Sequence, residues 1–151
     1  MKAKTEAGGQ TATRAQHIIY IVVAVLSVVG LAETTYLAAL HLAGVHAVCI
    51  TAANCSQVLG SKYASFHGIP LAGAGALAYF AAFSFATLAA FNYRRAAGLL
   101  ALTVTGMFLG TLVLLYLQAF VLHAFCDYCL FSAALIFLLA GLLIAAPPRR
   151  G

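Results

Sequence analysis

Long uninterrupted runs of hydrophobic residues dominate the pattern along the chain. Four such runs cover residues 17–41, 69–91, 97–122 and 126–146, and most polar and charged residues lie between or outside them. Each run is close to or above the roughly 20 residues that an α-helix needs to cross the hydrocarbon core of a membrane. The pattern therefore predicts an all-α integral membrane protein, a bundle of four transmembrane helices.

The composition supports lipid as the main solvent of the chain. Of its 151 residues, 64% are hydrophobic and only 7% are charged, whereas about a quarter of the residues of ordinary soluble domains are charged. Residues 1–16 are small and polar, so we expect a flexible cytoplasmic tail, and residues 147–151 form a second cytoplasmic tail. We expect residues 17–146 to form one membrane domain, with any larger catalytic partner supplied as a separate protein.

The basic residues predict the orientation in the membrane. Seven of the 8 Lys and Arg residues flank one side of the expected bundle: Lys2, Lys4, Arg14, Arg94, Arg95, Arg149 and Arg150. Short cytoplasmic loops collect Lys and Arg, so both termini are expected inside the cell. These charges are divided among short segments, which argues against a nucleic-acid surface. The first hydrophobic run is also too long for the core of a cleaved signal peptide.

The segment 42–68 between the first and second runs is long for a connection in a helical bundle, which favours a functional role. Asn54 can cap a short helix that begins at Cys55, and Gly60 can end it. Apolar and aromatic residues in this segment suit the membrane interface. We therefore expect a half-helix that lies across the outer mouth of the bundle.

Small residues in the third run predict close helix packing. Gly106 and Gly110 form a Gly-x-x-x-Gly motif, which lets two helices approach closely. We expect this motif to pack inside the bundle, and a dimer face is the alternative.

All four cysteines fall on the outer side of this topology: Cys49, Cys55, Cys126 and Cys129. Disulfides form and persist outside the cytoplasm, so the set indicates redox pairs. Cys126 and Cys129 lie three residues apart at the start of a helix, which brings both sulfurs to one face within disulfide reach. The free N–H groups and the positive dipole end of a helix start stabilise a thiolate. This pair is therefore the predicted redox centre.

Other uses of the cysteines stay open on these observations. Cys49 and Cys55 enclose five residues and suit a reversible disulfide, but a structural disulfide is also possible. Four thiolates also suit a zinc site, although zinc knuckles usually show two short Cys-x-x-Cys turns. A redox enzyme, a metal-binding membrane protein and a protein with purely structural disulfides are the three classes to separate.

Electrons leaving a pair at the membrane boundary can pass to a lipid-soluble quinone without a bound flavin or haem. Haem is the alternative because four histidines gather on the outer side: His41, His46, His67 and His123. They lie in the loop or near the ends of the runs rather than facing one another, so we expect neither haem nor metal. Glu33 lies within the first run, where an ionisable residue is a functional candidate. An interhelical hydrogen bond or a water-facing carboxyl is its alternative role.

Taken in order, these motifs resemble the vitamin K epoxide reductase family, in particular its bacterial members. The resemblance rests on Cys49-x5-Cys55, Ser61-Lys62-Tyr63-Ala64, Gly68-Ile69-Pro70-Leu71 and Cys126-x-x-Cys129, and it covers nearly the whole membrane domain. The DsbB-like quinone reductases also have four spans and two cysteine pairs, but in them the Cys-x-x-Cys motif comes first.

The resemblance implies an electron relay. An exported thioredoxin-like (DsbA-like) partner would attack Cys49, the freed Cys55 would attack Cys126, and Cys129 would pass electrons to ubiquinone or menaquinone. The family also has a serine near the active pair that matches Ser61. We therefore group Ser61 with Glu33 as candidate quinone-binding residues.

One departure from the family bears on the substrate. Vertebrate members carry a tyrosine four residues after the second active cysteine, where this chain has Ala133. The resemblance therefore implies a respiratory quinone in a bacterial cell membrane rather than vitamin K epoxide, whose reduction remains the alternative activity. Many bacterial relatives are fused to a thioredoxin-like domain, and here we expect that partner to be a separate protein.

Overall fold

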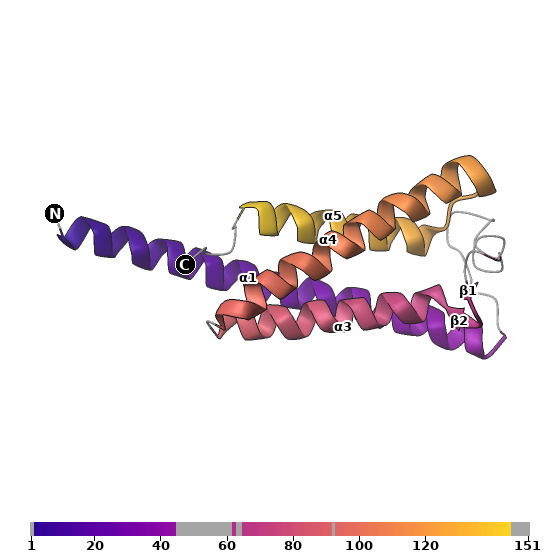
Figure 1. Ribbon diagram of the computed structural model, residues 1–151, viewed down its shortest axis with the longest axis horizontal. Helices are drawn as coiled ribbons and strands as arrows, with labels where there is room; N and C mark the ends of the chain where they lie inside the picture. Colours follow the sequence, from indigo (N-terminus) through magenta and orange to yellow (C-terminus); the bar gives the residue numbers. More distant parts are fainter. Residues whose placement is uncertain (1, 45–61, 63–64, 92, 146–151) are drawn as a thin grey trace.

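The computed structural model describes residues 2–44, 62, 65–91 and 93–145, which form an elongated helical bundle (Figure 1). In chain order its elements are α1 (Lys2–Leu42), β1 (Ser65–Phe66), β2 (Ile69–Pro70), α3 (Leu71–Ala90), α4 (Arg94–Tyr116), the π-helix η1 (Leu117–Leu122) and α5 (Asp127–Ala145). The start of α1 and the end of α5 lie toward one end of the bundle, and the β1–β2 hairpin lies at the other.

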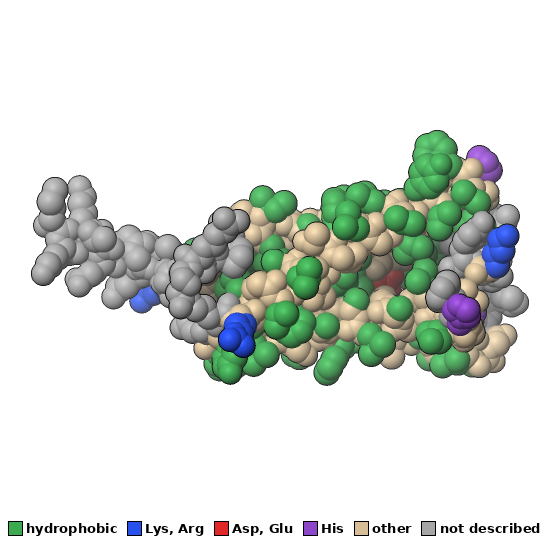
Figure 2. Space-filling view, viewed as in Figure 1, with side chains coloured by type: hydrophobic (Ala, Val, Ile, Leu, Met, Phe, Trp, Pro, Cys, Tyr) green, Lys and Arg blue, Asp and Glu red, His purple; other side chains and the backbone are tan. Residues whose placement is uncertain are grey.

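Within the described residues, four helical segments are long and apolar enough to cross a membrane: Arg14–Leu42, Leu71–Ala90, Arg95–Leu122 and Asp127–Ala145. Their outward faces are hydrophobic, with Leu77 72% exposed and Leu102 70% exposed. Figure 2 shows hydrophobic side chains along the length of the bundle, while Lys, Arg and His side chains lie toward its ends. The prediction of an all-α bundle of four transmembrane helices is confirmed.

The first helix differs from expectation at its N-terminal end. Residues 2–16, expected as a flexible tail, continue α1 as one helix from Lys2 to Leu42. The segment contains several good helix formers, including alanines and lysines, and it extends a helix that is already nucleated in the membrane, so adding each further residue requires no new nucleation.

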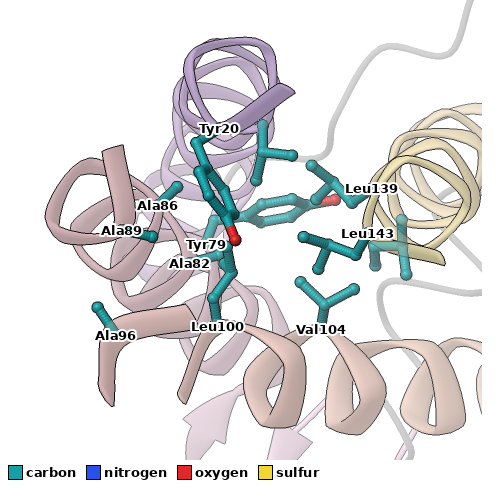
Figure 3. Close-up of a cluster of buried hydrophobic side chains, with 12 residues drawn as sticks. Tyr20, Tyr79, Ala82, Ala86, Ala89, Ala96, Leu100, Val104, Leu139 and Leu143 are labelled. Atoms are coloured by element: carbon teal, nitrogen blue, oxygen red, sulfur yellow. The ribbon is translucent and has the colours of Figure 1, made fainter. Parts of the chain in front are cut away.

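Small residues bring α3 close to its neighbours. Ala82, Ala86 and Ala89 recur at three- and four-residue intervals and are all buried, so one face of α3 presents no long side chains. Larger side chains from the other helices fill the space beside them, among them Leu100 of α4 and Leu139 of α5 (Figure 3). Tyr79 lies in the middle of this cluster.

A glycine in α1 makes room for the Tyr79 ring. A Cβ atom at Gly30 would lie closer to Tyr79 Cε1 than real Cβ contacts allow. The ring therefore rests on the backbone of α1. By contrast, a Cβ at Gly106 or Gly110 would meet nothing within 4 Å. The expectation that this Gly-x-x-x-Gly motif packs inside the bundle is wrong, because both glycines lie on the outward face of α4.

The described residues just before α3 form a tight hairpin. β1 and β2 pair antiparallel, with Phe66 opposite Ile69. The turn between them has positive φ at both His67 (51°) and Gly68 (82°), as two-residue turns with the correct twist require. The expected half-helix, together with Cys49, Cys55 and Ser61, lies outside the described residues.

Candidate active site

The chain reverses direction sharply between α4 and α5. The last turns of the third span widen into η1, and His123 then adopts a left-handed conformation with φ 48°. The backbone N–H groups of His123 and Ala124 both donate to the carbonyl oxygen of Gln118, the latter at 3.1 Å. This turn brings the start of α5 back against the end of the third span.

Gln118 also fixes the redox motif through its side chain. The residue is only 3% exposed, and its Oε1 accepts the backbone N–H of Cys126 at 3.3 Å. Its side chain also hydrogen-bonds the Cys129 thiol group. One buried amide therefore contacts both members of the cysteine pair and fixes the short segment that leads into α5.

Cys126 occupies the N-cap position of α5. Its carbonyl accepts the N–H of Leu130 at 3.0 Å, and the first helical residue is Asp127. Its sulfur accepts hydrogen bonds from the Cys129 thiol and from the backbone N–H groups of Tyr128 and Cys129. N-cap side chains normally use an oxygen to accept these N–H groups, and here a sulfur takes its place.

These hydrogen bonds stabilise the negative charge on Cys126. The Cys129 thiol has the largest effect and the two backbone N–H groups add to it, so the pKa of Cys126 falls from its usual value near 9 to about 6 despite burial and the nearby Asp127 carboxylate. The two cysteines do not form a disulfide with each other, and the Cys126 side chain is fully buried. The pair is therefore a thiolate and a neighbouring thiol.

Glu33 of α1 lies close enough to this pair to interact with it electrostatically. Both carboxylate oxygens are buried and have no hydrogen-bond partner among the described residues. The carboxyl group interacts electrostatically with Cys126, Cys129 and the hydroxyl group of Tyr79. The structure therefore brings one predicted site residue of the first span to the predicted redox centre in the last.

Tyr79 forms a bridge on the side of the site that faces the bundle core. Its hydroxyl group shares a 2.8 Å hydrogen bond with Ser132 Oγ and donates to the Ser132 carbonyl at 3.2 Å. Ser132 follows Cys129 by three residues, so it lies one helical turn below that cysteine on nearly the same face. Gly30, Tyr79 and Ser132 therefore link α1, α3 and α5 beneath the cysteine pair.

Sequence reasoning did not select Gln118, Tyr79 or Ser132. Gln118 carried a usable signal, because an amide side chain within a hydrophobic run needs a partner. Tyr79 carried a weaker one, as a large polar-tipped ring among alanines and glycines. Ser132 carried none, because serines in membrane helices commonly bond their own backbone, as Ser84 does here to the Phe80 carbonyl at 2.9 Å.

Neither metal alternative gains support from the described parts of the chain. No group of three or more His, Cys, Asp or Glu side chains forms a metal site among those residues. His41, His67 and His123 are exposed, and His46 lies outside the described range. A zinc site of four cysteines would need Cys49 and Cys55, which also lie outside it.

A comparison with protein families gives one match. The model of the vitamin K epoxide reductase family matches residues 21–144, a range that contains all four cysteines and most or all of each of the four described membrane-spanning helices. The chain belongs to the vitamin K epoxide reductase family. A comparison with curated proteins finds no match. Membership of this family makes the chain a multi-pass membrane thiol–disulfide oxidoreductase, and it confirms the predicted resemblance.

Proposed function

We propose that the protein oxidises thiols of exported proteins and passes the electrons to a membrane quinone. A thioredoxin-like carrier delivers two electrons to the Cys49–Cys55 pair, which passes them to the Cys126–Cys129 pair. That pair reduces ubiquinone or menaquinone to the quinol. The observation that carries this proposal is the buried Cys126–Cys129 pair, in which one sulfur is a stabilised thiolate and the other a thiol.

The stabilised thiolate suits Cys126 to exchange disulfides with the loop pair. In the relay, Cys55 attacks Cys126 of the Cys126–Cys129 disulfide and releases Cys129. Cys49 then attacks Cys55 of the resulting Cys55–Cys126 bond, and Cys126 leaves as a thiolate. A thiol with a lower pKa leaves faster in thiol–disulfide exchange, so the pKa of about 6 favours this second step.

Burial of the pair suits a lipid-soluble electron acceptor. Cys126 is fully buried and Cys129 is partly buried, and both lie where the fourth span begins. A quinone can reach such a position through the hydrocarbon. Ser61 and Glu33 remain the candidate residues for its binding, and of these only Glu33 lies within the described residues.

Vitamin K epoxide is the less favoured substrate. Ala133 stands where vertebrate relatives have a tyrosine, and it is buried in α5. Its methyl group offers no hydrogen bond to an epoxide or a ketone oxygen. We therefore expect purified protein to reduce respiratory quinones faster than vitamin K epoxide.

Quinone reduction by purified protein tests the main proposal. The protein in detergent is mixed with a reduced thioredoxin-like carrier and either ubiquinone or menaquinone, and quinol formation is followed by absorbance. We expect activity that Cys129→Ala abolishes. Full activity in Cys129→Ala would show that electrons do not pass through this cysteine.

The relay itself requires a different experiment. Cys126→Ala is expected to accumulate a mixed disulfide between Cys49 and the carrier, visible on a non-reducing gel. The control is the double variant Cys49→Ala/Cys126→Ala, which lacks the attacked sulfur and should trap nothing. If no adduct forms with Cys49 present, Cys49 and Cys55 serve a structural disulfide instead.

A further inference from the structure

The reduced cysteine pair carries one proton fewer than the reduction of a quinone to a quinol requires. Above pH 6 the reduced pair consists of the Cys126 thiolate and the Cys129 thiol, so it carries two electrons but a single proton. Reduction of a quinone to a quinol takes up two electrons and two protons. Disulfide formation therefore supplies both electrons and only one of the protons.

Glu33 is the described acidic side chain placed to supply the other proton. Its carboxyl group interacts with both sulfurs, from α1 across to the start of α5. The titratable groups that face it in the described residues are Cys126 and Cys129 at the start of α5 and Tyr79 of α3. Asp127, the first residue of α5, interacts electrostatically with Cys126. No basic side chain is among these groups.

The surroundings of Glu33 disfavour its charged form when the pair is reduced. Both oxygens are buried and unpartnered within the described residues, and burial of an unpaired carboxylate is costly. The neighbouring Cys126 thiolate adds like-charge repulsion in a region of low dielectric. Conversion of the thiolate to a disulfide removes that repulsion. The charged form of Glu33 is therefore less disfavoured when the pair is oxidised than when it is reduced.

We propose that Glu33 carries the second proton of the two-electron reaction. When the pair is oxidised, Cys126 and Cys129 form the disulfide and give up two electrons, the Cys129 proton and the Glu33 proton together complete the quinol, and Glu33 becomes a carboxylate. One negative charge thus moves from Cys126 to Glu33. When the loop pair next delivers two electrons and two protons, Cys129 and Glu33 each regain one proton. The identity of the acceptor rests on the proposed quinone function, but the coupling of Glu33 to the pair does not.

The pH dependence of the reduction potential tests this coupling without any quinone. The Cys126–Cys129 pair is equilibrated with redox buffers of dithiothreitol in a Cys49→Ala/Cys55→Ala background, and its oxidised fraction is measured by thiol trapping and mass spectrometry. For a two-electron couple each proton taken up changes the potential by about 30 mV per pH unit. In part of the range above pH 6, Cys126 is a thiolate and the parent pair takes up two protons on reduction, one of them on Glu33. There we expect the reduction potential to change by about 60 mV per pH unit in the parent protein and by about 30 mV per pH unit in Glu33→Gln.

Two further variants separate proton transfer from packing. Glu33→Asp keeps a carboxyl group and should keep the steeper slope. Thr34→Val removes the neighbouring buried hydroxyl group, which bonds the Gly30 carbonyl at 2.7 Å, and should also leave the slope unchanged. Identical slopes in Glu33→Gln and the parent protein at every pH would overturn the proposal.

Activity provides a second, separable readout. General acid catalysis by a positioned side chain typically contributes 10²–10⁴-fold, so Glu33→Gln should slow quinone reduction by about 100-fold or more. Absence of quinone reduction in the parent protein would overturn the proposed function and leave the slope result standing. Normal quinone reduction by Glu33→Gln, with equal slopes, would remove Glu33 from the reaction and leave the proposed function standing.

Discussion

Three hydrogen-bond donors of its own helix stabilise the Cys126 thiolate. The thiol of Cys129 contributes most, and the backbone N–H groups of Tyr128 and Cys129 follow. Because the pKa is lowered, the thiolate should predominate above pH 6 and become protonated as the pH falls below it. Ultraviolet absorbance of the thiolate, followed against pH in reduced protein that lacks Cys49 and Cys55, measures this directly.

The same titration identifies the main donor. Cys129→Ala should raise the pKa of Cys126, because it removes the largest stabilising hydrogen bond while both backbone donors stay in place. A titration of Cys126 near pH 9 in the parent protein would contradict the N-cap geometry.

Gln118 is expected to stabilise the whole turn before α5. In Gln118→Leu the backbone N–H of Cys126 loses its acceptor in a buried position, and such a group costs about 1–3 kcal/mol. We expect the free energy of unfolding in detergent to fall by that amount. Thr111→Val is the matched control in α4, because the Thr111 hydroxyl bonds only a carbonyl of its own helix, at 2.8 Å, and its loss should cost less than Gln118→Leu.

At the level of single residues, the sequence predicted the candidate reactive groups of the site better than the residues that hold those groups in place. Cys126, Cys129 and Glu33 were recognisable because thiols at a helix start and a carboxyl group at membrane depth are unusual. Gln118 and Tyr79 act through contacts between spans far apart in the chain. Those contacts depend on how the helices rotate and pack, which hydrophobic runs alone do not specify.

At the scale of the helices, Gly30 and Tyr79 set how closely α1 and α3 approach. Gly30→Ala would place a methyl group in the space that the Tyr79 ring occupies, too close to Cε1. Overpacking typically costs about 1–3 kcal/mol, so the free energy of unfolding should fall at least that far. Gly98→Ala in α4 is the control, since a Cβ there meets nothing within 4 Å, and it should be neutral or slightly stabilising.

Displacement of the Tyr79 ring in Gly30→Ala should also disturb the cysteine pair. Tyr79 bonds Ser132 one turn below Cys129, so Gly30→Ala is expected to reduce quinone reduction as well as stability. Gly98→Ala should leave the rate unchanged. Equal effects of the two alanine substitutions would show that the close approach of α1 and Tyr79 is not maintained in the membrane.

The helices themselves were predictable, whereas their interruptions were not. Hydrophobic length alone indicated four spans, because lipid admits few other structures. The widening at η1 and the left-handed His123 arise from the reversal that places α5 against the third span. Hydrophobic length did not predict the His67–Gly68 turn either, although a glycine between Phe66 and Ile69 is a recognisable hairpin signal.

At the scale of the whole molecule, Arg14 and Arg95 lie at the opposite end of the bundle from the cysteine pair. Arg14 and Arg95 begin the first and third spans, while Cys126 directly precedes the fourth. Since successive spans alternate in direction, the starts of the first and third share one side, and the start of the fourth lies on the other. The excess of Lys and Arg predicts that the first of these sides is cytoplasmic.

Labelling of single cysteines in intact cells tests this orientation. In a variant without the four native cysteines, Lys62→Cys should react with a membrane-impermeant maleimide, and Arg95→Cys should react only after permeabilisation. Both positions are exposed, so burial cannot cause the difference. The opposite pattern would put Cys126 and Cys129 in the cytoplasm. There the glutathione and thioredoxin systems keep thiols reduced, and a pathway that generates disulfides in exported proteins could not operate.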